Sequence, residues 1–349
     1  MGFWRKSIMA SVVWAVIASV SGYAEGGQAV QSGEFKMTLP LGLPSAQFKV
    51  PADNPMSNEK VELGRLLYFD KRLSADNTVS CATCHSPKQG FTDGQPVSTG
   101  IKGQKGGRSA PTVINRAFTG VQFWDGRADS LESQATGPLV NPIEMGMASH
   151  DAVVKKVAAI KGYGEMFQKV FGHDVTINDL AKAIAAFERT VISGNSRYDR
   201  FVAGDQKALN ASEKRGKELF EGKAKCISCH GGFNFSDEEY HNLGVGMAAA
   251  KPDPGRFNVT KKEEDKGAFK TPTLRDIAST APYMHDGGEK TLEDVVEFYN
   301  KGGVGNPTLS ARMEKLNLTA TEKKDLVAFM KALSGEGWRE IKAPEKFPR

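Results

Sequence analysis

Apolar residues recur at helical spacing in several stretches of the chain. One stretch follows Ser57, a residue type that caps helix N-termini, and predicts a helix that ends before Cys81. Its apolar positions are Val61, Leu63, Leu66 and Leu67. A longer stripe between Thr176 and Gly194 predicts a second helix, packed in the core of the first half of the chain. It consists of Ile177, Leu180, Ala181, Ile184, Phe187 and Val191.

Two more helices are predicted in the second half of the chain. One begins at Ser212, taken as its cap, and runs to Phe220. The other spans Thr319 to Leu333 and ends at Gly335. Few stretches alternate as strands do, and Gly- and Pro-rich loops such as 100–111 and 244–255 fill much of the rest. The pattern therefore predicts a mainly α protein with long loops and little strand.

The first residues read as an export signal. A basic start with Arg5 and Lys6 precedes an apolar run, and small residues lead up to Ala24. This order predicts a signal peptide over 1–24 and a periplasmic mature protein. A membrane anchor is the alternative, although the run is somewhat short for a span of about 20 residues.

The chain is long enough for two domains. Its 349 residues, 40% of them hydrophobic, suffice for two compact cores. We predict an N-terminal domain over 25–200 and a C-terminal domain over 201–349, with the boundary inside 193–210. The formal net charge of +5 includes two cations of the signal peptide. It is too mild to indicate nucleic-acid binding, which needs a concentrated basic face.

All four cysteines belong to two Cys-x-x-Cys-His units. The units are Cys81-Ala-Thr-Cys84-His85 and Cys226-Ile-Ser-Cys229-His230. Disulfides are the usual use of cysteine in exported proteins, and a Cys-x-x-Cys pair without the histidine could be a redox pair or half a zinc site. With the histidine, the spacing is that of covalent haem c attachment, with the histidine as the proximal iron ligand. The sequence thus predicts two cytochrome c-like domains with one haem c each.

Two haems suit either an electron carrier or an enzyme, and motifs around the haem units separate these classes. Three segments follow the first unit: 122–128 (QFWDGRA), 131–134 (LESQ) and 141–145 (NPIEM). Three more follow the second: 271–275 (TPTLR), 280–287 (TAPYMHDG) and 291–299 (TLEDVVEFY). Together they resemble the bacterial dihaem cytochrome c peroxidase and MauG family, from about residue 63 to 333.

The resemblance implies a role for particular residues. The first haem would be the peroxide site and the second the electron-transfer site. Glu144 would move a proton between the peroxide oxygens, Gln134 would hydrogen-bond in the distal pocket, and Trp124 would relay electrons between the haems. Thr280 and Pro282 would offer carbonyl oxygens to a calcium ion between the domains.

Without the resemblance, these residues have simpler interpretations. Glu144 would be a surface carboxylate or a cap, Gln134 a solvated helix residue and Trp124 a core aromatic. His285 could be a haem ligand or a partner of a haem propionate, and we favour the second. Three histidines lie in no motif and are interpreted as ordinary loop residues: His150, His173 and His241.

One departure from the family pattern concerns the second iron. Many of these peroxidases carry a Met ligand fourteen residues beyond the His of the Tyr-x-His-Asp-Gly turn, whereas this chain has Tyr299 there, as MauG-like relatives do. The alternative is a buried helix tyrosine with Met284 or Met313 as the ligand. A phenolate stabilises Fe(III) and higher states, whereas a thioether favours Fe(II).

The loop 100–111 contains two further departures. Peroxidases that need prior reduction often have a blocking His in this loop, where the chain has Ile101 with Lys102 beside it. Neither can act as a strong iron ligand, so we predict a first haem that is open in the oxidised state. Ser109 stands where the family usually has a calcium-binding Asn, which weakens the calcium prediction.

Three functional hypotheses follow. The first is a periplasmic dihaem peroxidase that reduces hydrogen peroxide to water with electrons from a small cytochrome or cupredoxin. The second is a MauG-like enzyme that uses peroxide to oxidise Trp or Tyr residues of a partner protein. The third, a non-catalytic electron carrier, is disfavoured by Glu144 beside an open first iron. The resemblance also suggests a homodimer.

Overall fold

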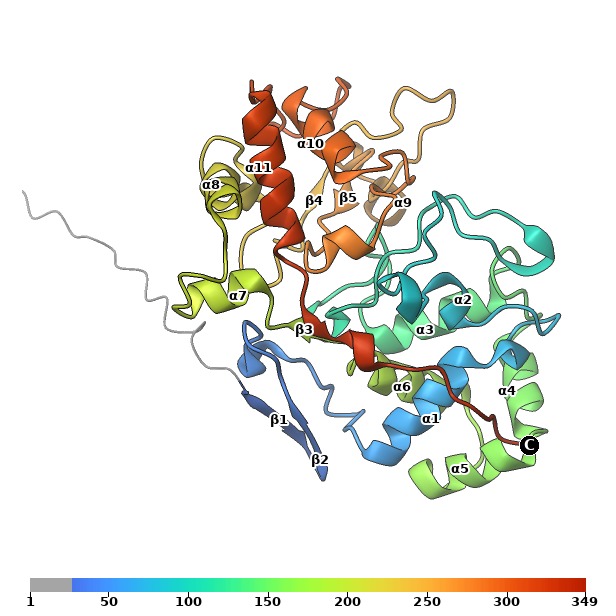
Figure 1. Ribbon diagram of the computed structural model, residues 1–349. Helices are drawn as coiled ribbons and strands as arrows, with labels where there is room; N and C mark the ends of the chain where they lie inside the picture. Colours follow the sequence, from blue (N-terminus) through green and yellow to red (C-terminus); the bar gives the residue numbers. More distant parts are fainter. Residues whose placement is uncertain (1–26) are drawn as a thin grey trace, which may run out of the picture.

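The protein is mainly helical, with paired short strands at three places. The computed structural model describes residues 27–349 (Figure 1), so the predicted signal peptide over 1–24 lies outside the described residues. Within 27–349, no helix is both long and apolar enough to cross a bilayer. This architecture agrees with the predicted fold class.

The first half of the chain surrounds the first Cys-x-x-Cys-His unit. It opens with a hairpin of β1 (Ala29–Ser32) and β2 (Phe35–Thr38), in which Ala29 pairs with Thr38. Its helices are α1 (Asn58–Phe69), α2 (Cys81–Cys84), α3 (Leu131–Val140), α4 (His150–Ala158), α5 (Lys161–Phe171) and α6 (Ile177–Glu188). The main core lies around α6, against which both α1 and α3 pack.

The second half surrounds the second unit. Its helices are α7 (Arg197–Val202), α8 (Ala211–Glu221), α9 (Phe257–Thr260), α10 (Leu292–Asn300) and α11 (Ala320–Lys331). Strands β4 (Tyr240–His241) and β5 (Phe269–Lys270) pair antiparallel beside them. A second core forms where α8 and α11 pack.

Both halves use the same helix crossing. In α1, a Cβ added to Gly64 would lie 1.8 Å from the carbonyl oxygen of Ala183 in α6. In α8, a Cβ added to Gly216 would lie 2.0 Å from the carbonyl oxygen of Asp325 in α11. A side chain cannot fit at either position, so glycine allows α1 to touch α6 and α8 to touch α11. The repetition is the structural counterpart of the repeated haem unit.

Most predicted helix starts are confirmed, and one is wrong. The side chains of Ser57, Thr176 and Thr319 cap α1, α6 and α11 by accepting a backbone N–H. Helix α8 is capped by Asn210, not by Ser212, because the Ser212 hydroxyl donates to Asp325 in α11 instead. Helix α11 ends at Lys331, four residues before Gly335.

The last residues of the chain return to the first half. Strand β6 (Glu336–Gly337) pairs with β3 (Ser193–Gly194), and Trp338 is buried in the first core. The amide of Gly162 in α5 donates to the carbonyl of Arg349 at 2.7 Å. The division at residue 200 stays a prediction, and the C-terminal tail packs on the N-terminal side of it.

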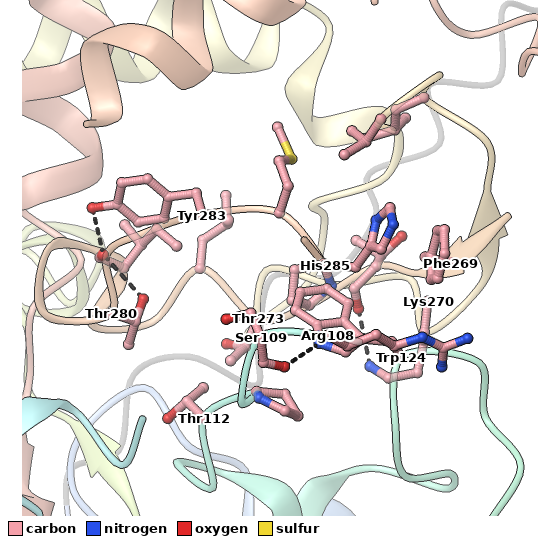
Figure 2. Close-up of a pocket in the computed structure, with 18 of the residues that line it drawn as sticks. Arg108, Ser109, Thr112, Trp124, Phe269, Lys270, Thr273, Thr280, Tyr283 and His285 are labelled. Carbon is pink, nitrogen blue, oxygen red and sulfur yellow. Dashed lines mark hydrogen bonds between the residues drawn. The ribbon is translucent and has the colours of Figure 1, made fainter. Parts of the chain in front are cut away.

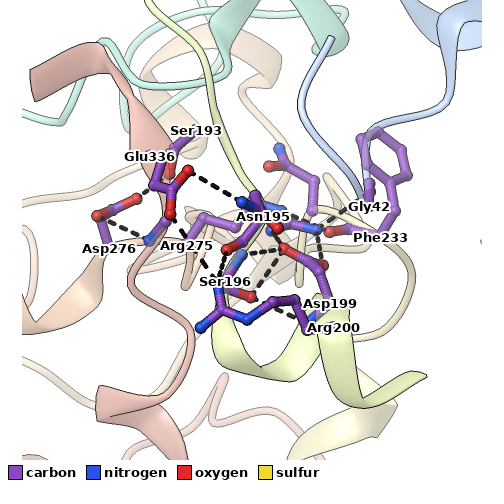
Figure 3. A network of polar contacts seen from close by, with 12 residues as sticks. Gly42, Ser193, Asn195, Ser196, Asp199, Arg200, Phe233, Arg275, Asp276 and Glu336 are labelled. Atoms are coloured by element: carbon purple, nitrogen blue, oxygen red, sulfur yellow. Dashed lines mark hydrogen bonds and ion pairs between the residues drawn. The ribbon is translucent and has the colours of Figure 1, made fainter. Parts of the chain in front are cut away.

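A buried ion pair lies at the boundary between the two halves (Figure 3). Asp199 in α7 receives two hydrogen bonds, of 2.8 and 2.9 Å, from the Arg275 guanidinium. Both side chains are at most 1% exposed. Arg275 also donates to the carbonyls of Phe233 and Gly42. The bond to Gly42 links this guanidinium to the segment before α1, in the first half of the chain.

This pair predicts a large stability effect. Replacing Asp199 by Asn leaves the Arg275 charge buried without a counter-ion, and we expect the free energy of unfolding to fall by about 3–5 kcal/mol. Guanidinium denaturation of the holoprotein, followed by circular dichroism, measures this value. The control is Glu62→Gln, which breaks the exposed Glu62–Arg65 pair and should cost at most about 1 kcal/mol. Equal effects of the two variants would contradict the prediction.

Candidate functional site

The first Cys-x-x-Cys-His unit is held as a rigid turn. Ser80 and Thr83 form a capping box at the start of α2, in which the Ser80 amide donates to Thr83 Oγ1 at 2.9 Å. His85 Nδ1 lies 3.3 Å from the carbonyl oxygen of Phe91, and the Tyr68 hydroxyl donates to the His85 carbonyl at 2.9 Å. Burial lowers the pKa of His85, which favours the neutral imidazole that binds metals. With Nδ1 engaged, Nε2 is the nitrogen available to iron.

The second unit repeats this geometry. The His230 amide donates to the Cys226 carbonyl at 2.8 Å, and His230 Nδ1 lies 3.0 Å from the carbonyl oxygen of Phe235. Burial also lowers the pKa of His230. Each histidine therefore has the backbone-fixed ring orientation typical of a metal ligand.

Both units open into one cavity of about 720 Å³ between the two halves. Cys84, His85, Cys226, Cys229 and His230 line it, while Cys81 packs against the first core beside it. The four cysteines are free, and burial raises the pKa of Cys84 to about 11 and that of Cys226 to about 12. At Cys229, hydrogen bonds with His241 and Arg312 outweigh burial and lower the pKa. All four sulfurs are available for thioether bonds. Two imidazoles with a free Nε2 and paired thiols beside a shared cavity fit two covalently attached haems.

Glu144 and Gln134 lie at the edge of the first part of the cavity. Gln134 projects from α3, whose opposite face buries Ala135 and Leu139 in the core. Glu144 follows α3 in a turn, where Asn141 Nδ2 donates to its Oε1 at 2.9 Å. Burial raises the Glu144 pKa, although the Arg127 charge opposes this. The structure brings both residues to the cavity.

Trp124 lies where the two halves meet (Figure 2). Its indole Nε1 donates to the Ser109 carbonyl at 2.9 Å, and its own carbonyl accepts the Lys270 amide of β5 at 2.7 Å. Arg108 binds Asp125 of the first half and Asp253 of the second. Trp124 is therefore in contact with both halves.

In the loop 100–111, neither Ile101 nor Lys102 is placed to ligate an iron. The Ile101 side chain is buried in the first core and does not line the cavity, and Lys102 is exposed. Gly100 does line the cavity, and a Cβ there would lie 1.9 Å from the carbonyl oxygen of Ile143. The backbone of this loop therefore lies against the turn that carries Glu144.

All three candidate ligands for the second iron line the cavity: Tyr299, Met284 and Met313. Tyr299 projects from α10, close enough to Cys226 and Cys229 that their charges affect its pKa. Burial raises that pKa above its usual value. The structure places the tyrosine at the second unit, and its coordination to iron stays a prediction.

The predicted calcium residues also reach the cavity. Thr280, Pro282 and Ser109 line it, and the Thr280 hydroxyl donates to the Ile277 carbonyl at 3.1 Å. Their carbonyl oxygens are of the type that calcium prefers. Calcium binding stays a prediction.

Two of the histidines lie at the cavity. His285 stacks on Phe269 with ring centroids 3.6 Å apart, and burial lowers its pKa. His241, which we interpreted as an ordinary loop residue, lines the cavity with its Nε2 2.9 Å from Asp237 Oδ2. It forms a cluster with Asp237 and Cys229. A thioether at Cys229 removes the thiolate from that cluster, so it is not a separate metal site.

Several charged residues that line the cavity were not singled out by the sequence patterns, and three of them lie near one another's charges. They are Arg116, Glu188 and Lys270. The one sequence signal that could have indicated Lys270 is its position directly before the 271–275 motif. Arg116 and Glu188 lie in stretches whose other residues predict only helix and turn.

The fold and the cavity define a two-haem protein of the cytochrome c class, and comparison with known proteins gives its family. Residues 58–207 match the family described as di-haem cytochrome c peroxidase, and residues 213–334 match cytochrome c. The methylamine utilization protein MauG of Methylorubrum extorquens is 39% identical over 93% of this chain and 94% of that protein. Cytochrome c551 peroxidase of Nitrosomonas europaea is 41% identical over 82% of this chain and 83% of that protein.

A solved structure gives the same result. The crystal structure of a MauG-like protein associated with microbial copper homeostasis has a TM-score of 0.79 and 37% identity, over 86% of this chain and 96% of that chain. The chain therefore belongs to the di-haem cytochrome c peroxidase family. It is an oxidoreductase that uses peroxide, and it carries two c-type haems.

The second-iron ligand generates a spectroscopic prediction. If Tyr299 ligates the second iron, Tyr299→Phe changes the low-spin electron paramagnetic resonance signal of the oxidised holoprotein. Tyr299→Met should also raise the reduction potential, because a thioether favours Fe(II). Met284→Leu and Met313→Leu are the controls and should leave the signal unchanged. A signal that survives Tyr299→Phe but is altered by either Met variant would refute the assignment.

Proposed function

We propose that this protein reduces hydrogen peroxide to water with electrons from a small redox protein, such as a cytochrome c or a cupredoxin. The observation that carries the proposal is the arrangement of side chains in the first part of the cavity. There a carboxylate, Glu144, faces the space beside His85, while Ile101 turns away from it. An electron carrier needs no such acid–base group, whereas peroxide reduction does.

The haems supply the iron at which peroxide binds and the centre that stores and passes on electrons. The chain supplies the proton transfer. The Glu144 carboxylate accepts a proton from one peroxide oxygen and returns it to the other, and Gln134 orients the peroxide by hydrogen bonding. The Asn141 side-chain amide holds Glu144 in place through its bond to Oε1. Each turnover consumes two electrons and two protons and yields two water molecules.

Trp124 is the proposed electron relay. Its backbone joins the second half through Lys270, and its indole N–H is fixed on the Ser109 carbonyl. A residue whose indole is fixed on the first half and whose backbone is fixed on the second keeps a constant position between the two haem units. That constancy is what a relay requires.

A MauG-like activity is the second candidate. Two observations favour it: Ile101 occupies the position of a blocking histidine, and Tyr299 stands at the cavity near the second unit. A phenolate-ligated second iron would be suited to share the second oxidising equivalent after peroxide attack. The substrate would then be a Trp or Tyr residue of a partner protein.

Three further features belong to the proposal. The sequence of residues 1–24 supports export to the periplasm. The family resemblance supports a homodimer. A calcium ion at Thr280 and Pro282 would join the halves, with Ser109 as a weaker neighbour than the usual Asn.

Replacing Glu144 by Gln tests the proton transfer. Because burial raises the Glu144 pKa above the usual 4.5, and only the carboxylate can accept a proton, the wild-type rate should fall as the pH drops through that raised value. The Gln variant should react about 10²–10⁴-fold more slowly and lose this acid limb. Stopped-flow mixing of the oxidised holoprotein with peroxide measures both effects. The exposed Glu165→Gln on α5 is the control, and a Gln variant with the wild-type rate would exclude the role.

Peroxide turnover separates the candidate functions. The oxidised holoprotein, without prior reduction, should show a high-spin paramagnetic resonance signal that disappears when peroxide is added. Steady-state turnover with reduced cytochrome c is expected of a peroxidase. Slow turnover together with peroxide-dependent oxidation of a partner protein would favour the MauG-like activity. A holoprotein that does not react with peroxide would be an electron carrier.

A further inference from the structure

The cavity contains two cationic side chains that the proposed function does not use. Arg116 lies in the turn Arg116–Phe118, in the first half of the chain. Lys270 ends β5 in the second half, and its amide bonds to the Trp124 carbonyl (Figure 2). Both side chains line the cavity. One cation therefore comes from each side of the boundary between the halves.

Other arginines of the protein have their counter-ions in the chain itself. Arg108, which also lines the cavity, is paired with both Asp125 and Asp253. Arg189 is paired with Glu132, as Arg275 is with Asp199. These pairs satisfy the rule that a buried charge needs an opposite charge beside it.

Arg116 has no such partner among residues 27–349. Its Nε donates to Gln122 Oε1 at 2.8 Å and its Nη2 to the Val121 carbonyl at 2.6 Å, and both acceptors are neutral. Its Nη1 makes no hydrogen bond to a described residue. Burial lowers the pKa of Arg116, because the charges of Glu238 and Glu188 do not offset its loss of hydration.

Lys270 is only partly compensated. Its Nζ donates to the Thr271 carbonyl at 3.0 Å and lies 3.4 Å from Glu238 Oε1. The other oxygen of Glu238 has no hydrogen-bond partner in the described chain. Burial still lowers the pKa of Lys270 to about 7, and the nearby Arg116 charge acts in the same direction. The 3.4 Å contact with Glu238 is thus the one ion pair of Lys270 among the described residues.

Glu188 does not supply the missing negative charge. It is 5% exposed and lines the cavity, yet no ion pair forms with Arg116, and its Oε2 has no partner in the described chain. Burial raises its pKa to about 8, so the group is mostly a neutral acid at pH 7. Among the described residues, Arg116 therefore has no ion-paired counter-ion and Lys270 has only the Glu238 contact.

The two haems that the cavity would hold carry negative charge on one edge of each porphyrin. A haem c is attached through its two former vinyl groups and bears two propionate carboxylates on the opposite edge. With thioethers at the cysteines, those carboxylates must lie away from the Cys-x-x-Cys-His turns. We propose that Arg116 and Lys270 together bind haem propionates across the boundary between the two halves.

This pairing has an electrostatic consequence. Reduction adds one negative charge to a haem, so a nearby cation stabilises the reduced form and raises the reduction potential. Loss of that cation lowers the potential and leaves a propionate without its partner. The effect concerns the haem itself and does not depend on peroxide.

Spectroelectrochemical titration of the holoprotein, without peroxide, tests the proposal. Lys270→Met removes the charge and keeps an unbranched side chain of similar length. At a fixed applied potential, the ratio of oxidised to reduced haem should rise at least tenfold for one of the two haems, which corresponds to a fall of 59 mV for a one-electron couple. Arg116→Gln should have an effect in the same direction.

Matched variants separate charge from packing. Lys270→Arg keeps the charge and should stay near the wild-type potential, and the exposed Lys262→Met should change nothing. If Lys270→Met fails to mature with two haems, Lys270→Gln, which keeps an N–H donor for the Thr271 carbonyl, takes its place. Wild-type potentials in all neutral variants, or an equal fall in Lys270→Arg and Lys270→Met, would overturn the proposal.

A free anion from solution is the other source of a carboxylate or phosphate ligand. Inorganic phosphate, varied at constant ionic strength, should leave the wild-type potentials unchanged, because the propionates already occupy the site. A potential that depends on phosphate concentration would assign the site to a free anion. This outcome would overturn the propionate assignment and leave the peroxidase proposal untouched.

Discussion

The buried Asp199–Arg275 pair is the interaction that anchors the boundary between the two halves, because Arg275 also donates to the Gly42 carbonyl of the first half. Its charges are almost fully removed from water, so the pair is stable only while each partner keeps its hydrogen bonds. Those bonds also include the carbonyls of Gly42 and Phe233, from segments far apart in the chain. A relative shift of the halves would break the bond from Arg275 to the Gly42 carbonyl and leave part of the buried guanidinium without a partner.

A fixed cavity gives each haem unit a defined environment. The turns of His85 and His230 are locked by local hydrogen bonds, so each unit can form independently. The position of Trp124 is fixed only when the halves are joined, because its carbonyl accepts a hydrogen bond from the Lys270 amide of the second half. The proposed electron relay through Trp124 would thus require the joined halves.

The cationic side chains in the cavity differ in whether the chain itself provides their counter-ions. Arg108 carries its own counter-ions from both halves, and this pairing makes it a structural link. Arg116 and Lys270 lack equivalent partners, so their charges are compensated only when a ligand brings negative charge. A protein that matures by covalent attachment of haem can tolerate such a deficit, because the ligand never leaves.

The sequence by itself determined the features that depend on short-range chemistry. The spacing of Cys81, Cys84 and His85 defines a haem unit, because the bonds to one porphyrin need that separation. Apolar periodicity and capping residues predicted α1, α6 and α11, and the family resemblance identified Glu144 and Gln134 as candidate site residues. Ser212 was the exception, because a tertiary contact with Asp325 overrode its local capping preference.

Only the tertiary structure decided which side chains share the cavity. Ile101 turns into the core and His241 turns toward the second unit, and no local pattern distinguishes these directions. Arg116 and Lys270 are more than 150 residues apart in sequence, and they become neighbours only when the halves pack. Burial and charge pairing are set by the whole chain, whereas helix starts and haem attachment are set by neighbouring residues.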